Sequence, residues 1–559
     1  MSEDMSNVDT AWLRMELPNN LMMITGVFVF DEPLDFERFR ATLEQRFLRF
    51  DRFRQRVVET RRGGHRWELD PHFDIANHVH RIALPAPGDQ VALQELVSDL
   101  MSTPLDYTKP LWQFHLVEGY QGGAAWIGRL HHCIGDGIGL MRVLLDMSDE
   151  SRDTVWQPPA EEEERLRSRS PWRIVTGPAS AAIGATRRMT GAVVGGSIDL
   201  VTNPSHALDY ARLGTETTMA LGRLLMLPPD PRTIYKGPLE VPKRAAWSDP
   251  IPLPKVKAIG RATGSTVNDV LLSAVAGALR RYAQTRDQQV DGLNVRGVIP
   301  VNLRQETAKI ELGNRFGLVF LSLPLGIDDP LDRLFELKRR MDDLKGSQEA
   351  VVAFGILNAI GMAPGEIENI VVNIFGAKAT AVMTNVPGPR RQIYFAGAPV
   401  REMMFWVPQS GRLGLGVSIF SYNDQVWLGI ATDQSLVPDP ETIVAYYGEE
   451  IDELYGLTQQ AAEWWSEGNL PAPASAAETT PDPAAPVEAP TALEQGEDDL
   501  TRLAGIGPTF AGRLSAAGVT TYTALAASTP DALAAIVQAP DWRRPDYASW
   551  IDQARALAH

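Results

Sequence analysis

Two adjacent histidines, His131 and His132, stand in the segment LHHCIGDG (130–137), which also contains Asp136 and Gly137. A neutral imidazole titrates close to pH 7, so it can remove a proton from a hydroxyl group. The segment lies between an apolar run typical of a strand, AAWIGRL, and a helix-like run, GLMRVLLDM. A junction of this kind exposes side chains and backbone N–H groups to a ligand. The residue types at this junction are therefore compatible with general base catalysis.

Three other interpretations of the segment stay open on these residues alone. Asp136 is a suitable N-cap, so the histidines could serve the fold only. Two histidines and one carboxylate could bind a metal ion, although the sequence shows no clear third ligand elsewhere. Cys133 and His132 could form a nucleophile–base pair, although adjacent side chains rarely point into one site. Cys133 is the sole cysteine of the chain, which excludes a disulfide framework and a thiolate zinc cluster.

A second polar segment, STVNDVLL (265–272), stands at the start of a helical pattern. Ser265 or Thr266 is a suitable cap, and Thr266 with Asp269 has the spacing of a capping box. Asn268 could instead face a binding site, where a neutral amide donates a hydrogen bond to a developing oxyanion. The sequence leaves the structural and the functional interpretation of this segment open.

These residues need a fold that brings them together, and the periodicity predicts a mixed α/β chain. Apolar runs typical of buried strands alternate with apolar residues spaced by three and four, which is typical of amphipathic helices. The same outline occurs in two halves of the chain. We predict strands at 21–30, 112–117, 124–131, 295–301, 317–324, 379–384, 413–420 and 425–431, and helices at 36–50 (with Asp35 as cap), 91–100, 267–279 and 440–455.

Composition divides the chain into five parts. Residues 469–499 form a linker with proline, alanine and acidic residues but no aromatic residue. Such a segment cannot bury a core, so we predict that it is disordered. The predicted parts are an N-terminal half (1–156), a helical crossover (157–245), a C-terminal half (246–468), the linker (469–499) and a small all-α domain (500–559).

The charge is strongly acidic, with 53 basic and 70 acidic residues and a net charge of −17. An acidic chain is a poor general binder of nucleic acid. The N-terminal segment MSEDMSNVDT lacks the basic and apolar regions of a secretory signal. No uninterrupted apolar stretch reaches the roughly 18 residues of a spanning helix. We therefore predict a cytoplasmic protein without a membrane span.

The ordered set of motifs gives a specific resemblance. His131-His132-x-x-x-Asp136-Gly137 matches the HHxxxDG motif of the CoA-dependent acyltransferase superfamily. Over residues 5–460 the chain resembles the bacterial wax ester synthase/diacylglycerol acyltransferase family, with blocks in the family's order. The blocks are Pro110-Leu111-Trp112 in PLDYTKPLW, Asn268-Asp269 in STVNDVLL, VIPVNLR (298–304), GNRFG (313–317) and Asn385-Val386-Pro387-Gly388 in TNVPGP.

The resemblance implies two chloramphenicol-acetyltransferase-like halves that form a central tunnel, with the HHxxxDG loop near its middle. It implies that His132 is the general base, that an arginine such as Arg304 holds Asp136, and that Gly137 leaves room for the substrate. Asn268 would face the tunnel. No metal or tightly bound cofactor is implied, because acyl-CoA is a co-substrate.

Two blocks have mainly structural interpretations. Asn385-Val-Pro387-Gly388 is a rigid turn after a strand, in which proline fixes φ and glycine takes a positive φ, and it could shape an entrance for CoA. The Pro110-Leu111-Trp112 block is expected to pack in the core, with the lining of an acyl channel as the alternative.

The resemblance also implies the reaction, an acyl transfer from acyl-CoA to the hydroxyl of diacylglycerol or of a long-chain alcohol. We favour diacylglycerol, and hence triacylglycerol formation. An amide-forming condensation enzyme of the peptide-synthetase type shares HHxxxDG and is the enzymatic alternative. A non-catalytic lipid- or partner-binding protein of the same fold is the other alternative, which the intact His132 and Asp136 disfavour.

Two regions raise the question of further partners. Residues 171–225 combine tryptophan and arginines with small apolar residues. We predict from this that the protein contacts a membrane or lipid droplet peripherally. A helix packed between the two halves is the competing interpretation. Residues 500–527 resemble a helix-hairpin-helix domain, with Gly505-Ile506-Gly507 as the turn. Because the tail 501–559 has five arginines against four aspartates and no lysine, we expect a protein-interaction or tethering module and not a nucleic-acid binder.

Overall fold

The chain forms two compact units, Met1–Leu470 and Pro471–His559, each with its own core. The structure is a computed structural model. It describes residues 2–61, 64–154, 226–304, 310, 312–345, 349–360, 372–409, 411, 413–466, 498, 500, 503, 513–515, 517–537 and 547–557. Most of the predicted crossover (157–245), nearly all of the linker (469–499) and the predicted turn Gly505-Ile506-Gly507 lie outside the described residues.

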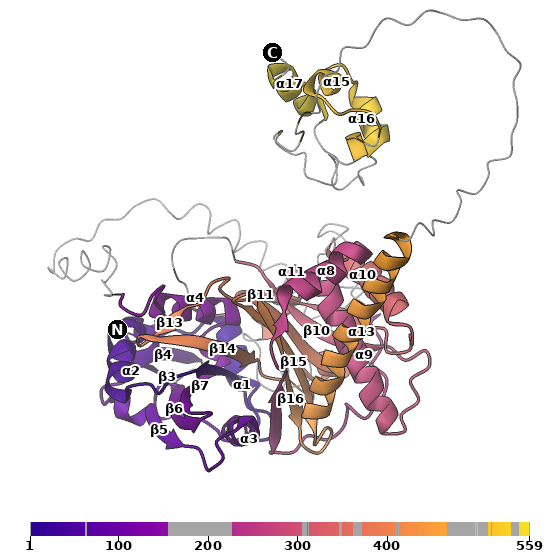
Figure 1. Cartoon of the computed structure of the whole chain (residues 1–559). Helices are drawn as coiled ribbons and strands as arrows, with labels where there is room; N and C mark the ends of the chain where they lie inside the picture. Colours follow the sequence, from indigo (N-terminus) through magenta and orange to yellow (C-terminus); the bar gives the residue numbers. More distant parts are fainter. Residues whose placement is uncertain are drawn as a thin grey trace, which may run out of the picture. The chain divides into compact units, whose positions relative to one another are not determined.

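The N-terminal half is built on a six-stranded sheet in the order β13-β14-β2-β7-β6-β5 (Figure 1). Its central strand β2, MITGVFVF, is buried at every residue, as a continuous apolar run requires. A smaller sheet has the order β1-β4-β3. The elements of this half are β1 (Ser2–Asp4), α1 (Asn7–Arg14), β2 (Met23–Phe30), α2 (Phe36–Thr42), β3 (Gln55–Glu59), β4 (His65–Leu69), β5 (Val79–Ala83), α3 (Gln90–Met101), β6 (Trp112–Tyr120), β7 (Gly123–His131) and α4 (Gly137–Met147).

The C-terminal half is built on a seven-stranded sheet in the order β11-β10-β12-β15-β16-β8, with β9 paired to β16. The helices α8, α9, α10 and α13 pack together beside this sheet (Figure 1). The elements are β8 (Lys243–Trp247), β9 (Ile251–Pro252), α8 (Leu253–Thr263), α9 (Val267–Thr285), β10 (Val295–Asn302), β11 (Phe316–Leu323), α10 (Pro330–Lys345), α11 (Glu349–Ile360), β12 (Ala381–Pro387), β13 (Tyr394–Phe395), β14 (Ala398–Trp406), β15 (Leu415–Tyr422), β16 (Gln425–Asp433) and α13 (Pro440–Ser466).

Two strands of the C-terminal half, β13 and β14, belong to the sheet of the N-terminal half. β14 pairs antiparallel with β2, from Trp406 opposite Thr25 to Val400 opposite Phe30. Gly26 makes this seam possible, because a Cβ there would lie 2.8 Å from the ring of Phe405. The first sheet is therefore complete only when both halves of the chain are present.

The strands predicted from the sequence are confirmed with shifts of a few residues at their ends, and the helices are confirmed in place, although α13 extends to Ser466, beyond the predicted end at 455. Asp35 caps α2, and its side chain accepts a hydrogen bond from the backbone N–H of Arg38. The predicted helix 36–50 is shorter, because α2 passes into a π-helical turn at Leu43–Phe47. The elements that the sequence did not predict include α1, which contributes to the region of the histidine motif described below, and β14, whose Phe405 lines a neighbouring cavity.

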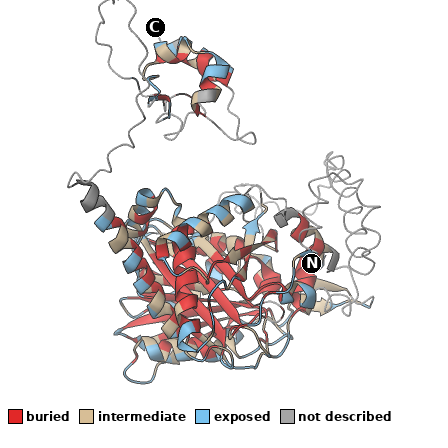
Figure 2. Cartoon of the chain, turned by 90° about the vertical axis from the view of Figure 1, so that its right-hand side faces the viewer, coloured by how far each residue is buried: buried red, intermediate tan, exposed pale blue. Residues whose placement is uncertain are grey.

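Burial follows the two sheets and the inner faces of their helices (Figure 2). The small C-terminal unit contains α15 (Tyr522–Ala526), α16 (Pro530–Val537) and α17 (Tyr547–Leu557) around Leu525, Leu533 and Trp550. Within the described part of the chain, no helix has the length and apolar character needed to cross a membrane.

Candidate functional site

The histidine motif lies where β7 turns into α4. β7 ends at His131, a short 3₁₀ turn spans His132–Ile134, and α4 begins at Gly137. Asp136 is the N-cap of α4, since its Oδ1 accepts a hydrogen bond of 2.9 Å from the backbone N–H of Gly139. The backbone N–H of His132 donates to the carbonyl of Met22 at 2.7 Å. Strand pairing and the cap thus fix the loop at both ends.

His132 is buried among aromatic rings. Its imidazole stacks on the indole of Trp12 with ring centroids 4.1 Å apart and planes 17° apart, and the ring of Phe316 lies 5.7 Å away. Burial lowers the pKa of His132 to about 4, so the imidazole is neutral at neutral pH. A neutral imidazole has the free lone pair that a general base needs.

Asn314 of the GNRFG block clamps the backbone of His132. Its side-chain Nδ2 donates hydrogen bonds to the carbonyl of His132 and to Oδ1 of Asp9, both at 2.8 Å. The backbone N–H of Asn314 also donates to Asp9 Oδ1, at 3.0 Å. Burial raises the pKa of the Asp9 carboxyl, which these hydrogen bonds partly offset. Helix α1 and the loop before β11 therefore meet at the carbonyl of His132.

Asp136 is held by Arg304, as the sequence predicted. The guanidinium Nη2 and Nε of Arg304 lie 2.8 Å and 3.2 Å from Oδ2 of Asp136, and both side chains are buried. The same oxygen accepts a hydrogen bond of 2.9 Å from the backbone N–H of Arg315. The carboxylate of the motif thus caps α4 with one oxygen and joins the C-terminal half with the other.

His131 and Cys133 do not line the cavity that His132 lines. Nδ1 of His131 accepts a hydrogen bond from the backbone N–H of Cys133, and its Nε2 lies 3.1 Å from Oε2 of Glu16. His131 therefore ties the loop to Glu16, whose Oε2 also accepts the backbone N–H of Met22. Cys133 is fully buried, and burial raises the pKa of its thiol well above the usual range. A buried, protonated thiol does not suit a nucleophile.

His132 lines a cavity of about 820 Å³, named here the central cavity, together with Trp12, Asp136, Gly137 and Asn385. A Cβ at Gly137 would meet no atom within 4 Å, so this glycine leaves the space beside the loop open. Among the described residues, no group of three or more His, Cys, Asp or Glu side chains is arranged to hold a metal ion.

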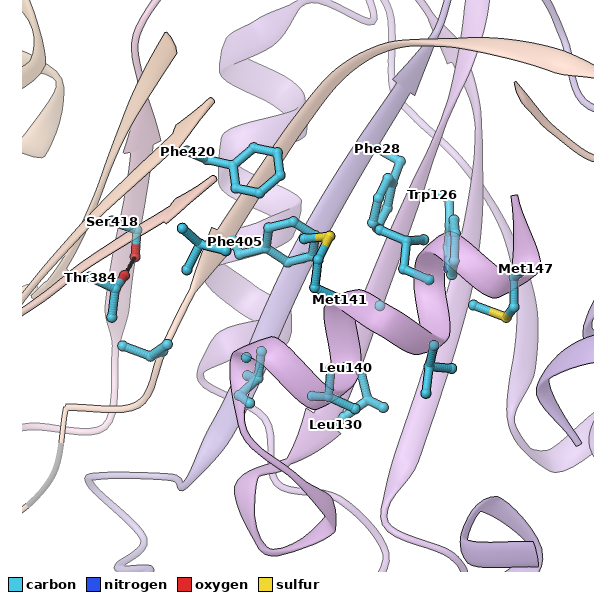
Figure 3. A pocket seen from close by; sticks show the side chains of 18 of the residues that line it. Phe28, Trp126, Leu130, Leu140, Met141, Met147, Thr384, Phe405, Ser418 and Phe420 are labelled. Atoms are coloured by element: carbon cyan, nitrogen blue, oxygen red, sulfur yellow. Dashed lines mark hydrogen bonds between the residues drawn. The ribbon is translucent and has the colours of Figure 1, made fainter. Parts of the chain in front are cut away.

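Two apolar cavities adjoin the central cavity. The first, of about 790 Å³ and named here the inner cavity, shares Gly137, Thr384 and Val386 with it. The inner cavity extends from the hydroxyls of Thr384 and Ser418 at one end to Trp126 and Met147 at the other (Figure 3). The second, of about 590 Å³, lies beside α11 and shares two lining residues with the central cavity, which are Val298 and Leu318. The three cavities, named together the passage, share lining residues, and His132 lines the central one.

The polar block residues meet at the rim of the central cavity. Asn385 lines this cavity, and its Nδ2 donates a hydrogen bond of 2.8 Å to Oδ1 of Asn268. Asn268 itself is exposed and is not among the lining residues. Asn385, and not Asn268 as expected, therefore faces the central cavity. Asp269 is buried and completes the predicted capping box with Thr266.

The expected positive φ at Gly388 is wrong, since this residue is absent from the left-handed glycines of the structure. Glycine is required for another reason. A Cβ at this position would lie 2.4 Å from the ring of Phe420 and 2.6 Å from the carbonyl of Ser421. The turn after Pro387 thus packs tightly on β15, to which the N–H of Gly388 donates a hydrogen bond of 2.7 Å.

The block Pro110-Leu111-Trp112 packs in the core, as expected. All three residues are buried, and the indole N–H of Trp112 donates to the carbonyl of Phe53 at 2.8 Å. None of the three lines the central cavity or the two cavities beside it. The alternative role, an acyl channel wall, therefore has no support from these cavities.

Three residues at the histidine were missed by the sequence analysis, namely Asp9, Trp12 and Asn314. Asn314 lies in the GNRFG block, which was recognised in the sequence, but no role was assigned to this residue. Asp9 and Trp12 lie in a helix of eight residues, Asn7–Arg14, too short for a clear periodic pattern.

Family models match most of the chain. Residues 5–271 match the wax ester synthase/diacylglycerol acyltransferase catalytic domain, and residues 312–455 match the C-terminal domain of the same family. The chain belongs to the wax ester synthase/diacylglycerol acyltransferase family. As a member of this family it is an acyltransferase, which confirms the predicted enzyme class. Residues 500–558 match the RS2/RL21/YNQ2 HHH domain, in agreement with the predicted helix-hairpin-helix tail.

Individual relatives of this family member span nearly all of the first unit. A Mycobacterium tuberculosis H37Rv protein named "Probable diacyglycerol O-acyltransferase tgs1" is 27% identical over 468 residues, covering 82% of this chain and 96% of that protein. The structure of the wax ester synthase/diacylglycerol acyltransferase from Marinobacter aquaeolei VT8 is 23% identical, with a TM-score of 0.59, covering 82% of this chain and 99% of that one.

A condensation domain has the same fold. The first condensation domain of the calcium-dependent antibiotic synthetase is 16% identical, with a TM-score of 0.52, covering 82% of this chain and 96% of that one. The likeness to these two solved structures confirms the predicted fold of two acyltransferase-like halves.

We predict that Arg304→Met lowers the free energy of unfolding of this acyltransferase by about 3–5 kcal/mol. The substitution leaves the buried carboxylate of Asp136 without its charged partner. Denaturant unfolding of the two variants gives the measurement. Arg339→Met is the control, because Arg339 is exposed and pairs with Glu336 on a helix surface, where a pair contributes less than about 1 kcal/mol. Equal stability of the two variants would contradict the prediction.

Proposed function

We propose that this acyltransferase transfers the acyl group of acyl-CoA to diacylglycerol and so forms triacylglycerol, and that it also esterifies long-chain alcohols. The observation that carries the proposal is the neutral, buried His132 in a cavity that shares wall residues with two apolar cavities. The names of the relatives support diacylglycerol as the acceptor. We expect that neither a metal ion nor a tightly bound cofactor takes part.

In the proposed reaction, His132 removes the proton of the acceptor hydroxyl while the hydroxyl oxygen attacks the thioester carbonyl carbon. A tetrahedral oxyanion forms, and its collapse breaks the carbon–sulfur bond. The CoA thiolate leaves and takes the proton from the imidazolium, which restores neutral His132 and releases CoA and the ester. No acyl-enzyme is needed, because the passage holds both reactants beside one base.

The surrounding residues have supporting roles in this proposal. Nδ1 of His132 is buried, so Nε2 is the nitrogen available to the substrate. Asp136 and His131 fix the loop, and Gly137 leaves space for the reacting carbonyl. Asn385 at the cavity rim is suited to donate a hydrogen bond to the oxyanion, with Asn268 orienting its amide.

Substitution of the base tests the reaction. We expect His132→Ala to lower kcat by on the order of 10²–10⁴-fold, the usual contribution of a general base. The assay follows labelled palmitoyl-CoA with diacylglycerol and hexadecanol in parallel. Full activity of His132→Ala would overturn the mechanism. Wild-type enzyme that acylates neither alcohol but acylates an amine would favour the condensation-type alternative, and an inactive wild type would favour a binding protein.

We propose that the inner cavity accepts the acyl chain of acyl-CoA, since aliphatic and aromatic side chains form most of its wall. Met147 and Trp126 close the end far from Thr384, so they would set the preferred chain length (Figure 3). We expect Met147→Ala to shift the preference toward longer acyl-CoA substrates and Met147→Phe toward shorter ones.

Competition between acyl-CoA substrates of different length measures this shift as a ratio of kcat/KM values. Met403→Ala is the matched control, because Met403 is buried but does not line the inner cavity. An identical ratio for Met147→Ala, Met147→Phe and wild type would place the acyl chain elsewhere.

We also propose that the protein associates peripherally with a membrane or lipid droplet from the cytoplasmic side, because its proposed substrates are lipids. Flotation with anionic liposomes tests this. We expect the full chain and a variant ending at residue 499 to float equally, since the tail 501–559, with five arginines against four aspartates, is nearly neutral. Retention of both in the bottom fraction would contradict the proposal.

A further inference from the structure

The contact between Trp12 and His132 is the closest aromatic contact of the proposed base. The two rings are stacked at 4.1 Å, and both side chains are about 95% buried. Trp12 also lies 5.9 Å from the ring of Phe316, which approaches His132 from the other half of the chain. The indole therefore presents its face to the imidazole in a site from which water is largely excluded.

The proposed reaction creates a charge at this place. When His132 takes the proton of the hydroxyl, it becomes an imidazolium in surroundings that lower its pKa. Of the nearby carboxylates, Asp136 favours the charged imidazole but is shared with Arg304, and Asp9 is hydrogen-bonded to Asn314. In the described part of the chain, Nδ1 of His132 has no hydrogen-bond partner, so no carboxylate is bonded to that nitrogen.

We propose that Trp12 is a further catalytic residue, whose indole face stabilises the imidazolium of His132 in the transition state by a cation–π interaction. An aromatic face attracts a cation through its quadrupole, and tryptophan does so most strongly among the side chains. The neutral imidazole of the resting enzyme gains little from this attraction, so the contact lowers the barrier and not the ground state. The inference rests on the proposed role of His132 as the base.

Helix α1 fixes Trp12 for this role. Ser6 caps the helix by accepting a hydrogen bond of 3.1 Å from the backbone N–H of Asp9. Asp9, one turn before Trp12, is bound in turn to Asn314, which holds the carbonyl of His132. The indole and the imidazole are thereby held by the same hydrogen-bonded group, which keeps the stacked geometry.

Progressive fluorination of the indole at position 12 tests the inference. Fluorine withdraws electron density from the ring face and leaves its shape nearly unchanged, so it weakens a cation–π contact without removing the packing. We expect log kcat to fall with each added fluorine, to a total loss on the order of 10-fold, while KM for acyl-CoA and for the acceptor stays constant. The same series at Trp427, which is buried and stacks on Tyr422, is expected to leave kcat unchanged.

Substitutions of Trp12 by natural amino acids give a second test of its role. We expect kcat to decrease in the order Trp12, Trp12→Phe, Trp12→Leu, with unfolding curves that confirm each variant is folded. A fluorinated series with constant kcat, in an enzyme that His132→Ala inactivates, would overturn the role of Trp12 and leave the base intact. Full activity of His132→Ala would instead overturn the proposed function itself.

Discussion

The ion pair between Asp136 and Arg304 is the constraint on which the site depends. One carboxylate oxygen caps α4 and the other binds Arg304 and the backbone of Arg315. The N-terminal half thereby supplies the loop, and the C-terminal half supplies the groups that hold it. Because the pair is buried, removal of Arg304 would leave the carboxylate with backbone N–H donors but no cationic partner, which weakens the hold on the loop.

Burial shifts the pKa values of His132 and Cys133 in opposite directions. It keeps His132 neutral, since the charged form is disfavoured where water is scarce. It makes Cys133 inert by keeping its thiol protonated. The same apolar surroundings thus keep both side chains uncharged at neutral pH. The cation–π contact proposed for Trp12 offsets part of the free energy that burial adds to the charged form of His132.

The sequence predicted the features that local patterns encode. The histidine motif, the capping box of Thr266 and Asp269, and most sheet strands depend on neighbours along the chain, and they appear as expected. Asp9, Trp12 and Asn314 act only because α1 and the loop before β11 meet at His132. The glycine at 388 was assigned the wrong cause, because a close approach of β15 leaves no trace in the local sequence.

The pairing of β14 with β2 also affects how the chain is made. β2 and β7 leave the ribosome early, whereas β14 ends at Trp406. At about 5–20 residues per second, the interval from His131 to Trp406 is on the order of 14–55 s. During this time the apolar strand β2 is an open sheet edge that can pair with another chain. Nascent chains of this enzyme therefore need either a transient cover for β2 or a low local concentration until the late strand arrives.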